Sequence, residues 1–284
     1  MNQSLKIIEC PRDAMQGVKQ FIPTNQKVQY INSLMQVGFD IIDFGSFVSH
    51  KYVPQMKDTA KVVSLLKMIE GTELLSIVLN NRGALDASVF DEIKIIGYPL
   101  SISEVFQKNN SNKTREESLF ILNEIQNTCI QKNKTMLVYV SMAFGNPYGE
   151  KLSKDVVFEY IHKIQQSGIK CISLADTIGN SNPESISDLY HDSVQIFPEL
   201  DIGLHLHSSP KEVYQKLQAA WDSGCRRIDV AIGGYGGCPF AQDQLVGNIP
   251  TDMLLNFLNL NNITHSLDLL AFENACNQSK KVFC

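Results

Sequence analysis

Two histidines at the end of an apolar run give this sequence its clearest chemical signal. The run Ile202–His207 is mostly apolar and carries His205 and His207 at its end. Alternate residues of a β-strand point to one face and lie roughly 6–7 Å apart, so the two imidazole nitrogens can converge on one metal ion. The alternative is that both histidines are ordinary polar residues at a strand end. Which interpretation holds depends on the other polar residues expected near them.

Other apolar runs also end on polar residues. Arg12 and Asp13 follow the first run, Asp43 and Ser46 end the second, and Asp176 follows the sixth. A carboxylate with two imidazoles suits a divalent first-row metal or magnesium, so we predict that Asp13 joins the two histidines. The alternatives are that Asp13 is a turn residue after a proline and that Asp176 caps a helix.

A glycine-rich segment follows the last apolar run. Gly233–Pro239 places four glycines around a tyrosine and ends with Cys238 and a proline. Packing does not explain this composition, so we predict a flexible lid that carries Cys238 over a substrate, where a thiol can donate or accept a proton. The alternative is a buried, small hydrophobic residue, which is our interpretation of Cys129, Cys171 and Cys225.

The elements that position these residues alternate regularly along the chain. We predict eight strands over Leu5–Cys10, Asp40–Phe47, Glu73–Leu79, Glu92–Tyr98, Thr135–Met142, Lys170–Ala175, Ile202–His207 and Arg226–Ile232. We predict helices over Lys27–Val37, Lys57–Ile69, Arg115–Ile130, Ser153–Gln166, Pro183–Ile196 and Pro210–Ser223.

Strands that alternate with helices favour a parallel sheet with right-handed crossovers. Eight such units fit a (β/α)8 TIM barrel of roughly 250 residues, whose active site lies at the C-terminal ends of the strands. We therefore predict one α/β domain over residues 1–284, in which the tail Leu267–Cys284 adds a last helix with a loosely held end. A doubly wound sheet is the alternative, but the first strand is not followed by a Gly-x-Gly-x-x-Gly turn.

Composition limits the classes of function. The formal charge is −5 and the basic residues are scattered, which argues against a nucleic-acid partner. No apolar run approaches the roughly 20 residues of a membrane span, and the N-terminus lacks a signal-peptide pattern. Seven cysteines without repeating spacing do not suggest a disulfide framework. We expect a cytoplasmic protein with no membrane partner.

Several motifs together resemble the hydroxymethylglutaryl-CoA lyase family of pyruvate-carboxyltransferase-like, metal-dependent barrels. The resemblance extends from about Leu5 to about Phe272. It rests on Arg12-Asp13 with Gln16, Ser46–Met56, Leu174–Gly179, His205-Leu-His207, Gly236–Pro239 and Gly247-Asn248. The Arg-Asp and His-x-His motifs are shared by a wider superfamily, whereas Ser46–Met56 and Gly236–Pro239 are narrower and favour the lyase.

The resemblance implies cleavage of 3-hydroxy-3-methylglutaryl-CoA to acetoacetate and acetyl-CoA, a reaction of leucine degradation. It implies an acyl-CoA substrate, Mg²⁺ or Mn²⁺ as cofactor, and a homodimer. The implied metal ligands are Asp13, His205, His207 and Asn248. The implied catalytic residues are Arg12, Asp43, Asp176 and Cys238, and the implied substrate contacts are Arg12, Gln16, Ser46 and Lys51. Arg12 would stabilise an enolate, and Cys238 would transfer a proton.

Three features depart from the family pattern. Asp43 stands where members usually carry glutamate, Ser208-Ser209 replaces the more frequent Asp-Thr, and the segment from Cys238 to Asn248 is about one residue longer than in the animal enzymes. The alternatives are an enzyme that acts on another 3-hydroxyacyl-CoA or condenses a 2-oxo acid with acetyl-CoA, and a non-catalytic ligand-binding barrel. The combination of metal-ligand residues with a cysteine on a predicted lid argues against the last.

Overall fold

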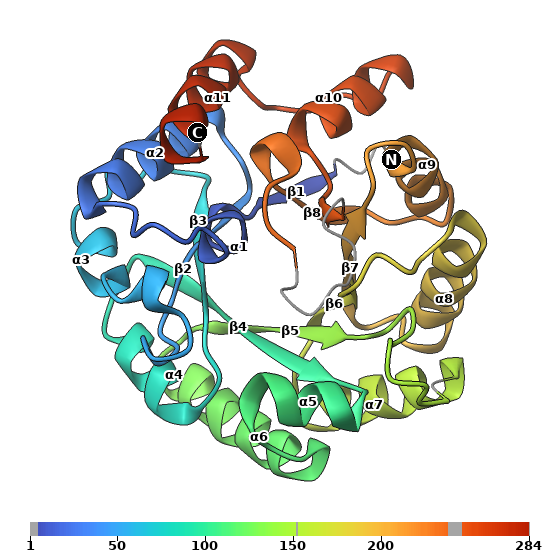
Figure 1. Cartoon of the computed structure of the whole chain (residues 1–284). Helices are drawn as coiled ribbons and strands as arrows, with labels where there is room; N and C mark the ends of the chain where they lie inside the picture. Colours follow the sequence, from blue (N-terminus) through green and yellow to red (C-terminus); the bar gives the residue numbers. More distant parts are fainter. Residues whose placement is uncertain (1–4, 152, 238–245, 284) are drawn as a thin grey trace.

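A computed structural model describes residues 5–151, 153–237 and 246–283. Within these ranges, eight parallel strands form a closed barrel (Figure 1). The pairings β6–β7, β7–β8 and β8–β1 close the ring, and the predicted (β/α)8 barrel is confirmed. The strands are β1 (Lys6–Glu9), β2 (Ile41–Ser46), β3 (Glu73–Ile77), β4 (Ile93–Ser101), β5 (Thr135–Ser141), β6 (Cys171–Asp176), β7 (Asp201–Ser208) and β8 (Arg227–Val230).

Helices form a ring outside the strands (Figure 1). The longer ones are α2 (Thr24–Val37), α4 (Asn81–Ser88), α6 (Arg115–Gln131), α7 (Lys154–Gln166), α8 (Pro183–Ile196), α9 (Val213–Asp222), α10 (Thr251–Leu260) and α11 (Leu269–Phe283). Their ends follow local chemistry: Thr114 begins α6 with a capping box, and Gly38 ends α2 with a φ of 84° that other residues rarely adopt.

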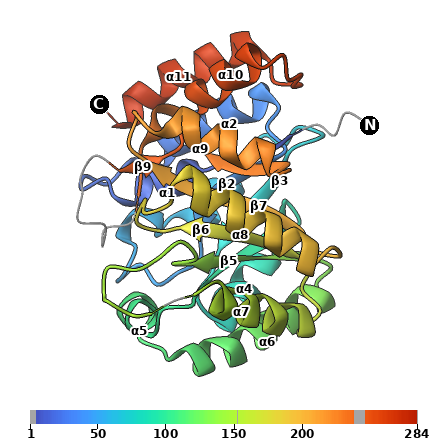
Figure 2. The same cartoon turned by 90° about the vertical axis from the view of Figure 1, so that its right-hand side faces the viewer.

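Short elements lie at the carboxyl ends of the strands. They are α1 (Pro11–Gln16), α5 (Glu104–Ser111), the 3₁₀ turns η1 (Pro54–Met56) and η2 (Ile232–Gly234), and β9 (Gly247–Asn248), which pairs antiparallel with β7. In the side view, β9 and α5 both lie toward the left end of the barrel (Figure 2). This end carries the predicted site residues.

Two hydrophobic cores support the barrel. The larger core lies between the strands and the helices, and a smaller one fills the barrel with residues that include Ile8, Leu75 and Leu137. The amino-terminal end of the barrel is filled by the buried side chain of Arg227, whose Nε lies 3.2 Å from Asp201 Oδ1. The polar groups at the carboxyl ends of the strands therefore lie on the apolar layer that fills the barrel.

Several elements differ from the sequence-based predictions, which did not include α1, α4, α5, α10 or β9. The helix predicted over Lys57–Ile69 is reduced to α3 (Thr59–Val63). The residues after Glu9 form helix α1, so the alternative of a turn at Asp13 is excluded; a proline at the first helical position is pre-organised for helix. Within the tail, the last predicted helix is present as α11, which packs on α2, and up to Phe283 it is not loosely held, since the Phe283 ring stacks on Tyr235 at 4.4 Å between centroids.

Among the helices in the described ranges, none has the length and apolar character needed to cross a membrane.

Candidate active site and metal centre

A cavity of about 170 Å³ opens at the carboxyl ends of the strands. Because all eight strands are parallel, side chains from distant parts of the chain meet there. The polar residues that line it come from α1, β2, β5, β7 and the segments that follow the strands: Arg12, Asp13, Gln16, Ser46, Asn110, Tyr139, Ser141, Thr177, His205 and His207.

The two histidines of β7 point into this cavity with their Nε2 atoms 3.2 Å apart. The Nδ1 atom of His207 lies 3.1 Å from the carbonyl oxygen of Thr177, and the Nδ1 atom of His205 lies 2.9 Å from Asp229 Oδ2. A carbonyl and a carboxylate only accept hydrogen bonds, so both Nδ1 atoms carry the proton. Each Nε2 atom therefore presents a lone pair to the other.

Two lone pairs at this separation repel each other unless a proton or a cation lies between them. Burial would lower the pKa of His205, but the hydrogen bond to Asp229 and the charges of Asp229 and Asp13 raise it. Burial and the neighbouring His205 lower the pKa of His207. The closely spaced Nε2 atoms, 3.2 Å apart, therefore suit a shared cation.

Asp13 completes a three-residue cluster with the two histidines, whose ligand atoms all lie within 4.8 Å of one another. Its Oδ1 atom accepts a hydrogen bond from Gln16, and its Oδ2 atom accepts one from Asn248 Nδ2 at 2.6 Å. Burial would raise the pKa of Asp13, but Arg12 and the imidazoles lower it to about 2. The group is therefore an anion at neutral pH.

Asn248 lies beside this cluster because β9 pairs with β7, which places Asn248 opposite His207. Its amide group donates to Asp13 and to the carbonyl oxygen of Tyr235. Its Oδ1 atom is buried and has no hydrogen-bond partner among the described residues, which is unusual for a buried polar atom. An unpaired amide oxygen next to a carboxylate and two imidazoles fits a site for a divalent cation.

Arg12 supplies the positive charge of the cavity. Its Nε and Nη2 atoms bind Asp43 Oδ2 at 3.0 and 2.6 Å, and its Nη1 atom binds Gln16 and Asp13. Burial raises the pKa of Asp43 to about 6 although Arg12 opposes the shift. Asp43 and Asp13 raise the pKa of Arg12 above its ordinary value despite burial, so the guanidinium stays charged and fixed in direction.

Comparison with known proteins places this arrangement in a family. The sequence model of the HMGL-like family matches residues 5–278. The chain belongs to the HMGL-like family. It is 32% identical over 268 residues to the rat (Rattus norvegicus) protein named 3-hydroxy-3-methylglutaryl-CoA lyase, cytoplasmic, an alignment that covers 93% of this chain and 77% of the relative. The hydroxymethylglutaryl-CoA lyase YngG of Bacillus subtilis is also 32% identical, with 87% and 82% covered.

Solved structures of HMGL-like proteins share the whole fold. An HMG-CoA lyase from Acinetobacter baumannii in complex with coenzyme A and 3-methylmalate has a TM-score of 0.92 at 30% identity, covering 100% of this chain and 92% of that one. The HMG-CoA lyase of Brucella melitensis has the same TM-score at 28% identity, with 99% of both chains covered. The sequence-based assignment to this family is thereby confirmed.

The remaining predicted site residues of this HMGL-like chain differ in their placement. Gln16 and Ser46 line the cavity. Asp176 does not line it and instead accepts hydrogen bonds from the backbone of Asn180 and Ser181. Lys51 is exposed, with its Nζ atom 6.0 Å from the ring centroid of Tyr52. Cys238 lies outside the described residues.

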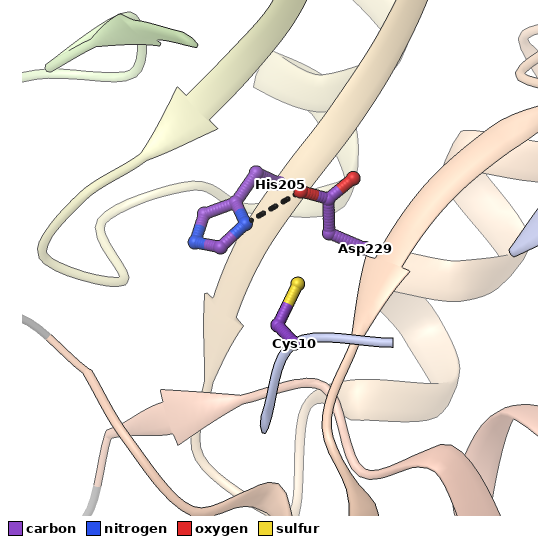
Figure 3. A group of neighbouring side chains, drawn as sticks. All are labelled: Cys10, His205 and Asp229. Carbon is purple, nitrogen blue, oxygen red and sulfur yellow. Dashed lines mark hydrogen bonds and ion pairs between the residues drawn. The ribbon is translucent and has the colours of Figure 1, made fainter. Parts of the chain in front are cut away.

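Among the residues near the HMGL-like site that the sequence analysis missed, two contact His205. Tyr139 of β5 lines the cavity with its ring edge-on to His205, and its hydroxyl has no partner among the described residues. Asp229 of β8 contacts His205 (Figure 3). The alternation of side chains along a strand could have placed Asp229 in the barrel interior, because it shares one face of β8 with Arg227. The register that pairs Asp229 with His205 depends on contacts between β7 and β8 and cannot be read from either strand alone.

Proposed function

We propose that this chain is a divalent-metal-dependent lyase that cleaves 3-hydroxy-3-methylglutaryl-CoA to acetoacetate and acetyl-CoA. One observation carries the proposal: Asp13, His205 and His207 present ligand atoms within 4.8 Å of one another, beside the guanidinium of Arg12. The relatives named HMG-CoA lyase support the reaction, and the coenzyme A complex of the Acinetobacter protein supports an acyl-CoA substrate.

Asp13, His205, His207 and Asn248 would hold the cation. Mixed oxygen and nitrogen ligands suit Mg²⁺ or Mn²⁺, and the unpaired Oδ1 atom of Asn248 supports its inclusion. When bound, the cation would act as a Lewis acid that polarises the substrate's oxygens and acidifies its tertiary hydroxyl.

Arg12 would stabilise the charge that develops during cleavage. When the carbon–carbon bond breaks, its electron pair moves to the departing thioester fragment, which becomes an enolate. A guanidinium fixed in a buried cavity stabilises such a charge without reorganising. Asp43 would act through Arg12, since it binds both Nε and Nη2 and so fixes the direction of the guanidinium.

The proton balance requires one more group. The hydroxyl proton has to leave the substrate, and the enolate carbon has to gain a proton. We assign this transfer to Cys238, because a thiol can exchange a proton near neutral pH. In the sequence, Cys238 directly follows Gly236 and Gly237 and precedes the proposed metal ligand Asn248.

Other residues would act on substrate binding or position. Gln16 and Ser46, which line the cavity, are proposed to contact the acyl group, and Lys51 is proposed to contact the coenzyme A phosphates. Asp176 would help to position the proposed metal ligand His207. It accepts a hydrogen bond from the backbone of the turn that follows Thr177, and the carbonyl oxygen of Thr177 orients the His207 ring.

The compartment and the assembly are part of the same proposal. The rat relative is named cytoplasmic and a chicken (Gallus gallus) relative mitochondrial. We propose the cytoplasm, because the cysteines in the described ranges are free thiols, as expected in a reducing compartment. The homodimer rests on the family resemblance, and light scattering of the purified protein tests it.

A coupled assay for acetyl-CoA release from 3-hydroxy-3-methylglutaryl-CoA tests the function. We expect release with Mn²⁺ or Mg²⁺, loss after chelation, and recovery when metal is added back. The variant His205→Ala should lose both metal and activity, whereas His191→Ala, on the exposed side of α8, should keep both. No release from protein with demonstrably bound metal would show that the substrate is wrong.

A further inference from the structure

Asp229 is a buried carboxylate that lies outside the proposed set of metal ligands. It lies on β8 with 0% of its surface exposed, and the parallel register of β7 and β8 places it opposite His205. Its Oδ2 atom is 2.9 Å from His205 Nδ1, and Figure 3 shows the carboxylate directed at the imidazole ring. The contact therefore follows from strand register and not from a flexible loop.

Two other buried carboxylates near the site, those of Asp176 and Glu9, hold the backbone in place. Both oxygens of Asp176 accept hydrogen bonds from the turn after β6, and both oxygens of Glu9 accept hydrogen bonds from the segment after β8 and from Thr251. Asp229 differs, because its Oδ1 atom has no partner among the described residues. A buried carboxylate whose hydrogen-bond partner among the described residues is an imidazole nitrogen is placed to act on that ring.

We propose that Asp229 is a positioning residue that sets the affinity of the metal site. By accepting the Nδ1 proton it fixes the tautomer of His205, turns the Nε2 lone pair toward His207 and Asp13, and makes the ring a stronger ligand through its negative charge. This inference rests on the proposed metal site, and its test separates the two.

Cys10 offers a rival explanation of the same cluster. Its sulfur atom lies near His205 and Asp229 (Figure 3), and the ligand atoms of the three residues lie within 4.8 Å of one another. An inner site for a thiophilic metal would require the His205–Asp229 hydrogen bond to be given up. Because that hydrogen bond is formed in the structure, we treat Cys10 as a residue that packs beside His205 and Asp229 and not as a metal ligand. Removal of its thiol therefore serves as a control.

The variant Asp229→Asn tests the inference. Asparagine keeps the size of the side chain but carries no charge, and its amide can donate to Nδ1 and so move the ring proton to Nε2. After chelation, titration with Mn²⁺ by calorimetry should give a Kd about 10- to 100-fold higher than in the wild type. Excess Mn²⁺ should restore much of the lost turnover.

Two matched controls separate this effect from general damage. Asp201→Asn removes a carboxylate from the same strand pair at the opposite end of the barrel, where Asp201 pairs with Arg227. Cys10→Ala removes the thiol beside Asp229. Both variants should keep the Mn²⁺ affinity of the wild type. A loss in Cys10→Ala equal to that in Asp229→Asn would overturn the inference in favour of the thiol site.

A second measurement does not depend on how the variant folds. In the chelated wild type, where no metal holds Nε2, ¹⁵N NMR of the histidine rings should show His205 protonated at Nδ1. An unprotonated Nδ1 atom, or unchanged Mn²⁺ affinity in a folded Asp229→Asn protein, would overturn the role of Asp229. If the wild type itself binds neither Mn²⁺ nor Mg²⁺, the proposed function fails with it.

Discussion

Glu9 is the acid whose removal we expect to change the pH dependence of stability most clearly. It is fully buried on β1, where Ile232 N donates to its Oε1 atom at 2.8 Å and Thr251 Oγ1 donates to its Oε2 atom at 2.6 Å. Glu9 thus binds Ile232 and Thr251, the residues on either side of the chain segment that contains Asn248. Glutamine has nearly the same shape and can satisfy both partners, so Glu9→Gln should fold.

The magnitude follows from the pKa of the buried acid. Burial raises the pKa of Glu9 from its ordinary value of 4.5 to about 8, although its hydrogen bonds oppose the shift. Between these values the unfolded chain releases the proton and the folded chain keeps it. The stabilising contribution is therefore complete below pH 4.5 and is lost as pH rises to 8, at up to about 1.4 kcal/mol per pH unit or about 5 kcal/mol in total.

Urea unfolding of the chelated protein between pH 5 and 8 measures this contribution. The fluorescence of Trp221 reports the transition, and chelation removes the contribution of metal binding. The unfolding free energy of the wild type should fall relative to that of Glu9→Gln as pH rises. Glu73→Gln, on the exposed start of β3, is the control and should follow the wild type. Parallel profiles for the wild type and Glu9→Gln would refute the reasoning.

Three further predictions concern the proposed catalytic and substrate-binding residues. Arg12→Lys cannot span Asp43 with two nitrogen atoms, so at saturating metal its kcat should fall roughly 100-fold or more; near wild-type kcat would exclude guanidinium stabilisation. Cys238→Ser should lower turnover by orders of magnitude while metal analysis shows wild-type content, and Cys129→Ser should remain active; an active Cys238→Ser enzyme would exclude the thiol as proton carrier. Lys51→Ala should raise KM for the acyl-CoA at unchanged kcat, and unchanged steady-state kinetics would remove Lys51 from the substrate site.

The barrel could be predicted because most of its strands lie in short apolar runs that alternate with helical patterns. The two imidazoles of β7 could be predicted for the same reason, since a spacing of two residues in a strand fixes a common face. Their approach to 3.2 Å between Nε2 atoms agrees with that argument. Local periodicity was sufficient to predict this pair because one strand, β7, carries both histidines.

Features that depend on contacts between distant segments were not predictable. The apolar pattern of Leu65 and Leu66 extended the predicted helix, yet α3 ends at Val63 and Leu65 is exposed. Helix α1 has only six residues, too few for periodicity to reveal. Asp229 looks like a charge within a strand, and its partner His205 is decided by the register between β7 and β8.

The closure of the barrel also has a consequence for biosynthesis. Asp13 is made about 190 residues before His205, which at about 5–20 residues per second is an interval of roughly 10–40 s. During that time its carboxylate has no imidazole neighbours, because β7 and β9 do not yet exist and β1 still lacks its partner β8. The proposed cation site therefore forms only in a chain whose first strand has already paired with its last, and a cation bound there would stabilise that β1–β8 pairing.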